Sequence, residues 1–95
     1  MKTPEIYEAT LEEVEEINEL GFDTRVILFN DEIHSFDEVI NQIIKAINCN
    51  FEKATQITTE AHKNGKAEVY CGELAESIRI SSVLNEIFLK TQIEC

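Results

Sequence analysis

The sequence predicts a small α+β domain, a βααβαβ sandwich in which three helices pack against a three-stranded antiparallel sheet. Three observations predict this class. A β-branched and aromatic run ends in a polar cluster, as a buried strand does at its exposed end. Two consecutive segments repeat apolar residues every three or four positions, and each follows a capping residue. A chain of 95 residues also suffices for one modest core but not for two lobes.

The first strand is expected at residues 25–30, and the polar residues that end it begin a loop. Ser35 and Glu38 have the spacing of a reciprocal capping box, which predicts a helix from Phe36 to Asn48. The apolar residues of this helix share one stripe and are expected in the core. They are Phe36, Val39, Ile40, Ile43, Ile44 and Ile47.

A second helix is expected from Phe51 to Asn64, because Asn50 can cap its start and Gly65 can end it in a left-handed conformation. Its inward side is expected to comprise Phe51, Ala54, Ile57, Thr58, Ala61 and His62.

The remaining elements follow from alternation and helical spacing. Residues 66–71 alternate as a strand does, a third helix is expected at residues 73–89, and residues 91–95 supply a short last strand. The residues that the third helix is expected to bury are Leu74, Ile78, Val83, Leu84, Ile87 and Phe88.

Composition limits the partners and the compartment. Nineteen acidic residues against eight basic ones give a net charge of -11, which argues against nucleic acids and anionic membranes as partners because both would be repelled. Three widely spaced cysteines without a CxxC pair favour a reduced compartment, and we expect a cytoplasmic protein. No cofactor is indicated.

The charge also divides the chain. Residues 1–24 hold eight acidic residues and one lysine, and we interpret them as an acidic N-terminal extension to a core domain at residues 25–95. The spacing of Leu11, Val14 and Ile17 is compatible with a short amphipathic helix, and a solvated tail is the alternative.

The candidate site lies where the first strand ends. Asn30 ends that strand and Asp31 follows it, and His62 lies at the end of a segment with one apolar face, so together they predict a site for an ammonium group beside an apolar pocket. Taken singly, Asn30 and Asp31 are also typical of turns and caps, and a lone inward histidine is typical of packing.

Several segments resemble the ClpS family, the adaptors of the Clp AAA+ protease. The resemblance covers residues 25–95 and depends on Asn30-Asp31-Glu32, on Ala54-Thr55-Gln56-Ile57 and on the segment from His62 to Ala67. The segment Asn30-Asp31-Glu32-Ile33-His34-Ser35 also resembles the ClpS-like domain of eukaryotic N-recognin ubiquitin ligases.

The resemblance implies an N-degron receptor that delivers its substrates to a Clp AAA+ unfoldase of the ClpA or ClpC type. Substrates would begin with Leu, Phe, Tyr or Trp, and their α-amino group would meet Asn30, Asp31 and His62, with Glu32 and His34 at the lip. The pocket wall that it implies comprises Leu28, Phe36, Val39, Thr58, Ala61 and Ile93. Phe36 replaces the methionine common at the gate, and Thr58 and Ala61 are smaller than the usual wall residues.

Two other classes compete with a receptor. An enzyme would use Asp31, Glu32 and His62 in acid–base chemistry, or a metal bound with His34, but the sequence has no activated nucleophile, no glycine-rich phosphate loop and no compact metal spacing. A purely structural interaction module would have a similar fold without recognising an N-terminal residue. We therefore expect a non-catalytic protein without a metal.

Overall fold

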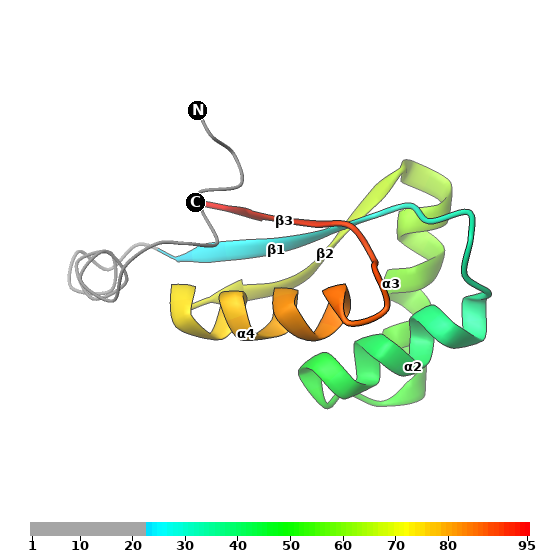
Figure 1. The fold of residues 1–95 in the computed structure, drawn as a ribbon, viewed down its shortest axis with the longest axis horizontal. Coiled ribbons are helices and arrows are strands. Elements are labelled where there is room, and N and C mark those ends of the chain that lie inside the picture. The colour runs from blue at the N-terminus through cyan, green and yellow to red at the C-terminus, as the bar shows by residue number, and fades with distance from the viewer. Residues whose placement is uncertain (1–22) are drawn as a thin grey trace.

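A computed structural model describes residues 23–95, which form three helices and three strands in the predicted order. In the labels of Figure 1, the elements are β1 (Thr24–Phe29), α2 (Phe36–Ile47), α3 (Phe51–Asn64), β2 (Lys66–Gly72), α4 (Leu74–Asn85) and β3 (Thr91–Glu94). The predicted acidic N-terminal extension lies outside the described residues, apart from its last two positions.

The sheet is antiparallel, and β1 lies in its centre between β2 and β3. Arg25 pairs with Cys71 on one side and with Glu94 on the other, and the register with β2 shifts between Val26 and Ile27. The helices cover one face of this sheet, with α4 running along the strands and with α2 and α3 near the end where β1 leaves the sheet (Figure 1). The predicted α+β architecture is therefore confirmed.

The core lies between this face of the sheet and the three helices. Val26 and Leu28 of β1 are almost fully buried and pack in one cluster with Ile43 of α2 and Leu84 of α4. Alternation along β1 produces this arrangement, because every second side chain of a strand points to the same face. This packing anchors β1 to residues of all three helices.

The predicted caps set the starts of α2 and α3. Ser35 Oγ accepts a hydrogen bond from the backbone N–H of Glu38 at 3.1 Å, and Glu38 Oε1 accepts one from the N–H of Ser35 at 2.8 Å. Asn50 Oδ1 accepts one from the N–H of Lys53 at 2.7 Å. Gly65 ends α3 at φ 89°, a left-handed conformation that glycine adopts at little cost.

Three aromatic side chains are more exposed than their periodicity predicts. Phe51 is 62% exposed, Phe36 is 44% exposed, and His62 is exposed as well. The prediction of core-facing positions for Phe36, Phe51 and His62 is therefore wrong. Phe51 is the first residue of α3 and His62 lies in its last turn, where the helix has passed beyond the elements that bury its middle.

The predicted third helix is too long at its C-terminal end. α4 stops at Asn85, and Phe88, which was expected in the core, is 88% exposed. Phe88 N–H donates to the Asn85 carbonyl at 2.9 Å and Leu89 N–H donates to the Leu84 carbonyl at 3.3 Å, which is the hydrogen-bond pattern of a Schellman ending. Apolar periodicity continues through this turn and conceals the end of the helix.

Phe88 occupies an unfavourable conformation in that turn. Its φ of 68° is left-handed, and a Schellman ending normally places glycine there. A side chain with a Cβ costs about 1–2 kcal/mol in this region. The turn is held in place by the two backbone bonds and by Asn85 Nδ2, which donates to the Leu89 carbonyl at 2.6 Å.

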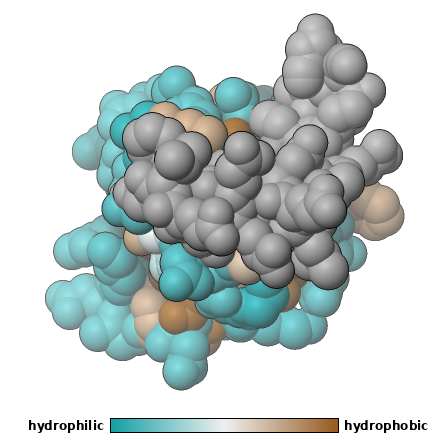
Figure 2. Space-filling model, turned by 90° about the vertical axis from the view of Figure 1, so that its left-hand side faces the viewer, coloured by the Kyte–Doolittle hydropathy of each residue, from teal (hydrophilic) through white to brown (hydrophobic). Residues whose placement is uncertain are grey.

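The opposite end of the sheet contains satisfied polar side chains. Thr24, one residue before the expected start of the strand, is fully buried, and its hydroxyl lies 2.7 Å from that of Ser77. A second buried hydroxyl pair, Ser81 with Thr91 at 2.6 Å, lies nearer the end where β1 leaves the sheet, because Thr91 pairs with Leu28. Among the coloured residues visible in Figure 2, hydrophilic ones predominate and hydrophobic ones form small patches.

Candidate functional site

Asn30 is held beside the end of α3. Its backbone N–H donates a hydrogen bond to the Gly65 carbonyl at 2.9 Å, which links the end of β1 to the residue that terminates α3. His62 lies one turn earlier in the same helix, so this bond brings Asn30 and His62 to one site. The Asn30 side chain makes no hydrogen bond within residues 23–95 and is partly exposed, which leaves its amide available to a ligand.

Asp31 and His34 form a compact turn after Asn30. Asp31 Oδ2 accepts hydrogen bonds from the backbone N–H of Ile33 at 3.1 Å and from that of His34 at 2.5 Å, and it lies 2.7 Å from His34 Nδ1. Within the described chain, the other carboxylate oxygen of Asp31 has no such partner. The carboxylate is therefore oriented by its own loop while one acceptor stays unused.

The pKa of Asp31 lies below its ordinary value. Burial raises this pKa, but the hydrogen bond from the backbone of His34, the hydrogen bond and charge of the His34 ring, and the N–H of Ile33 together outweigh burial. Asp31 is consequently a carboxylate at neutral pH, and it contributes negative charge to the site.

A small, partly enclosed cavity connects these polar groups to the core. Its wall is made by Leu28, Phe29, Asn30, Asp31, His34, Phe36, Val39, Thr58, Ala61, His62 and Leu89. Residues from β1, the following loop, α2 and α3 thus meet at one place, although they are separated along the chain. Its volume of about 20 Å³ is little more than the room needed by one water molecule.

Two aromatic rings close the cavity on its outer side. The rings of Phe36 and His62 meet edge to face, with centroids 5.4 Å apart and planes at 72°. Both residues are exposed on their outer sides, so a change of rotamer needs little repacking. The cavity of about 20 Å³ is too small for a bulky side chain, so residues of its wall must move to admit one, and these two exposed rings can move with the least repacking.

The side chains that α3 contributes between its ends to the cavity wall are small, and they present apolar atoms to the cavity. Thr58 is 4% exposed, and its hydroxyl donates to the Ala54 carbonyl at 2.8 Å within the helix. Because that hydroxyl is satisfied, the methyl group is what Thr58 offers to a ligand. Ala61, also buried, adds only one carbon to this wall.

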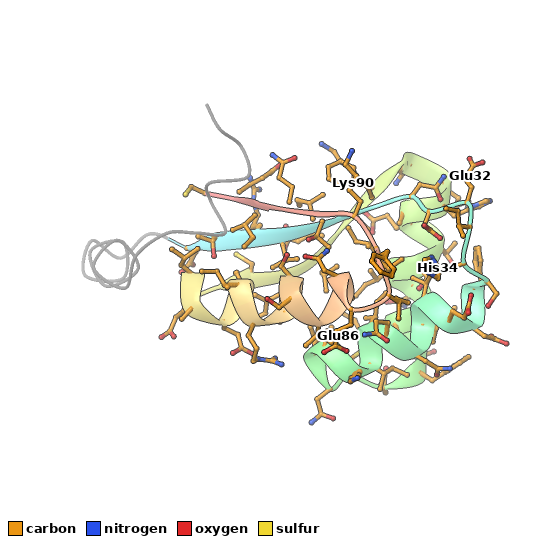
Figure 3. All side chains as sticks on the ribbon, viewed as in Figure 1. Glu32, His34, Glu86 and Lys90 are labelled. Carbon is orange, nitrogen blue, oxygen red and sulfur yellow. The ribbon has the colours of Figure 1, made fainter. Side chains whose placement is uncertain are left out.

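Two of the predicted site residues lie elsewhere. Glu32 is exposed and does not line the cavity; in Figure 3 it extends outward from the loop. Ile93 pairs with Val26 in the sheet and packs against Leu74 and Ile78, near the other end of β1. The last strand runs antiparallel to β1, so its later residues move away from the cavity.

Two lining residues escaped the sequence interpretation. Phe29 is the last residue of β1, where alternation would direct its side chain away from the core. Leu89 follows the unexpected turn after α4. A prediction that ended this helix at Asn85 would have placed Leu89 in the loop before the last strand, where it can line the cavity. The Lys90 ammonium, one residue before β3, lies 5.8 Å from the centroid of the Phe29 ring.

The arrangement suits recognition of a cation that adjoins an apolar group. An amide, a carboxylate and an imidazole offer acceptors, and the cavity beneath them is mainly apolar. Within residues 23–95, no cluster of three or more His, Cys, Asp or Glu side chains could hold a metal ion. In the same residues, no helix is long and apolar enough to cross a membrane.

Comparison with known proteins relates this chain to one family. The model of the family described as "ATP-dependent Clp protease adaptor protein ClpS" matches residues 22–92. The chain is 37% identical over 57 residues to the ATP-dependent Clp protease adapter protein ClpS of Campylobacter jejuni, which covers 60% of this chain and 57% of that protein.

Part of a much larger protein is similar as well. The E3 ubiquitin-protein ligase UBR1 of Drosophila melanogaster is 32% identical over 68 residues, covering 70% of this chain and 4% of the ligase. The chain thus spans less than two thirds of the length of each of these two relatives.

A solved structure has the same fold. Agrobacterium tumefaciens ClpS2 bound to L-phenylalaninamide superimposes with a TM-score of 0.71 at 17% identity, covering 76% of this chain and 94% of that one.

Proposed function

Because the chain belongs to the ClpS family, we propose that it binds proteins through a free α-amino group and a bulky hydrophobic first side chain. The observation that carries this proposal is one cavity that has Asn30, Asp31 and His62 among its wall residues, together with the apolar residues Leu28 and Val39. These groups match the two features that distinguish an N-terminal residue from an internal one.

The polar groups account for recognition of the ammonium. An α-ammonium has three N–H donors, and the free amide oxygen of Asn30, the unused oxygen of Asp31 and a ring nitrogen of His62 can accept them. Hydrogen bonds to a charged group contribute about 1.5–3 kcal/mol each, whereas an exposed ion pair contributes about 0–1 kcal/mol. The partial burial of Asp31 therefore favours a measurable contribution to binding.

The apolar wall accounts for selection of the side chain. Burying about 150 Å² of an aromatic side chain at about 25 cal/mol/Å² contributes roughly 4 kcal/mol before association costs. Thr58 and Ala61 leave room on the α3 side once Phe36 and His62 have separated. We expect ligands that begin with Leu, Phe, Tyr or Trp.

A neighbour of the same fold supports this ligand chemistry. L-phenylalaninamide, the molecule bound to the Agrobacterium ClpS2, combines a free amino group with an aromatic side chain. We further propose a non-catalytic adaptor role in the cytoplasm, in which the bound protein is delivered to a Clp AAA+ unfoldase of the ClpA or ClpC type.

Binding is tested by titrating the full chain with two fluorescent peptides that share one sequence beginning with Phe, one with a free and one with an acetylated N-terminus. Acetylation removes the charge and leaves the side chain intact, so we expect at least a tenfold loss of affinity. Equal affinity would contradict N-terminal recognition and would favour an interaction module of another kind.

Delivery is tested separately. A Clp unfoldase–protease should degrade a protein that begins with Phe faster in the presence of this chain. The acidic segment is removed only as far as residue 22 in the matched variant, because Thr24 is buried in the fold. Retained peptide binding with lost degradation would assign delivery to that segment, whereas unimpaired degradation would exclude that role.

A further inference from the structure

A second hollow adjoins the cavity on the side of α2. It has a volume of about 480 Å³, and its wall comprises His34, Glu38, Asn41, Gln42, Glu86, Ile87 and Phe88. His34 belongs to the walls of both hollows, so the two lie next to each other with this residue between them. In Figure 3, His34 on the loop after β1 and Glu86 on the turn after α4 lie at opposite sides of the intervening space. We name the second hollow the α2 groove.

Exposed hydrophobic side chains concentrate around this route. The large hydrophobic side chains exposed in residues 23–95 are Ile33, Phe36, Phe51 and Phe88. Phe36 closes the cavity, Ile33 is next to His34 in the loop, and Phe88 lines the α2 groove. An exposed ring held at a φ that favours glycine is unfavourable for folding and for solubility, which points to a role in binding.

The polar groups of the α2 groove suit an extended peptide. The Asn41 side chain is exposed and makes no hydrogen bond within residues 23–95, so its amide can both donate to and accept from a peptide backbone. Glu86 is paired with Lys45 at 2.9 Å, whereas Glu38 has no cationic partner in the described chain. The groove therefore retains negative charge, which repels acidic side chains.

We propose that the α2 groove receives the residues that follow the first residue of a bound peptide. Phe88 contacts the side chain of the second or third residue, and Glu38 selects against acidic side chains at these positions. This inference rests on the proposed function, because the first residue must occupy the cavity for its successors to reach His34.

Phe88→Gly is the decisive variant, because it removes the ring and at the same time relieves the left-handed backbone. It should raise the thermal midpoint by several degrees. We expect this variant to bind a five-residue peptide beginning Phe-Leu with roughly 3- to 10-fold lower affinity. The affinity for L-phenylalaninamide should be unchanged. Phe51→Ala, which removes another exposed ring outside the groove, is the matched control and should change neither affinity.

Charge selection is tested with peptides that differ only in Asp or Lys at the second position. The unmodified chain should prefer Lys roughly 2- to 5-fold, and Glu38→Gln should remove most of this preference while its amide oxygen still accepts from Ser35 N–H.

The outcomes separate the two levels of the argument. If L-phenylalaninamide fails to bind the unmodified chain, the proposed function and this inference are both overturned. If it binds, but Phe88→Gly leaves the affinity of the five-residue peptide unchanged, only the role of the α2 groove is overturned.

Discussion

Both ends of β1 carry polar side chains, and the two ends use them in opposite ways. At the start of the strand, the Thr24 hydroxyl is fully buried, donates to the Gly72 carbonyl at 3.1 Å and lies 2.7 Å from the Ser77 hydroxyl. At the other end, the Asn30 amide is partly exposed and has no hydrogen bond within the described residues. One end is closed by the protein itself, and the other is open to a ligand.

This difference teaches where function lies in a small domain. Buried polar groups are almost always hydrogen-bonded, because an unmade bond costs about 1–3 kcal/mol. In residues 23–95, no buried side-chain nitrogen or oxygen lacks a partner. A polar side chain without a partner is therefore found only where water or a ligand can reach it, and at the edge of an apolar cavity the ligand is the more specific partner.

The largest effect is expected at the open end, from Asn30→Ala. Loss of a hydrogen bond to the ligand ammonium should cost about 1.5–3 kcal/mol, or roughly 10- to 150-fold in affinity. The free energy of unfolding should change by less than about 0.5 kcal/mol, because the side chain has no partner in the fold. Peptide titration and urea denaturation measure the two quantities, and a destabilised variant with full affinity would contradict the comparison.

The closed end should behave in the reverse manner. Thr24→Ala leaves the buried Ser77 hydroxyl without its partner, so we expect the free energy of unfolding to fall by about 1–2 kcal/mol. Peptide affinity at a temperature where the variant is fully folded should be unchanged. A loss of affinity there would show that the two ends of the strand are coupled, and that the division between them is wrong.

The smallest expected change in the free energy of unfolding is that of Asp31→Asn. Asp31 accepts hydrogen bonds from its own loop and also lines the cavity. Its pKa is lowered in the folded state, so its charge stabilises the fold above about pH 4, and this stabilisation fades as the pH falls through the folded-state pKa. Asp31→Asn should therefore cost up to about 1 kcal/mol at pH 7 and less at pH 3, as measured by urea unfolding. An equal cost at both pH values would exclude the charge as the cause.

Much of the fold was predictable because local signals agree with one another. Ser35 with Glu38, Asn50 and Gly65 mark helix ends that the structure confirms by their hydrogen bonds and dihedral angles. These signals act through neighbouring backbone groups, so they do not depend on distant parts of the chain.

The site could be predicted in part for a related reason. Asn30, Asp31 and His62 were placed together from their positions at element ends, and all three line one cavity. Whether they bind an ammonium remains a prediction. Ile93 was wrongly assigned to the cavity wall. Its position along β1 depends on the strand register, which no local pattern in a four-residue strand specifies.

Phe88 shows the limit of periodicity. Apolar spacing continues through Ile87 and Phe88, yet the chain turns after Asn85 without the glycine that usually marks such a turn. A sequence pattern records where side chains would lie if the helix continued. It does not record that the backbone leaves the helix at a conformational cost, which is the feature that gives Phe88 its exposed position.

The pairing of Arg25 with Glu94 places the beginning and the end of this fold on adjacent strands. Both lie at the end of the sheet away from Asn30, as Figure 1 shows for the end of β3 and the start of β1. Such a unit can be inserted into a loop of a host protein, or circularly permuted, without disturbing the cavity. A fold with adjacent ends is also suited to insertion into a much longer chain, and a segment similar to this chain makes up 4% of the Drosophila ubiquitin ligase.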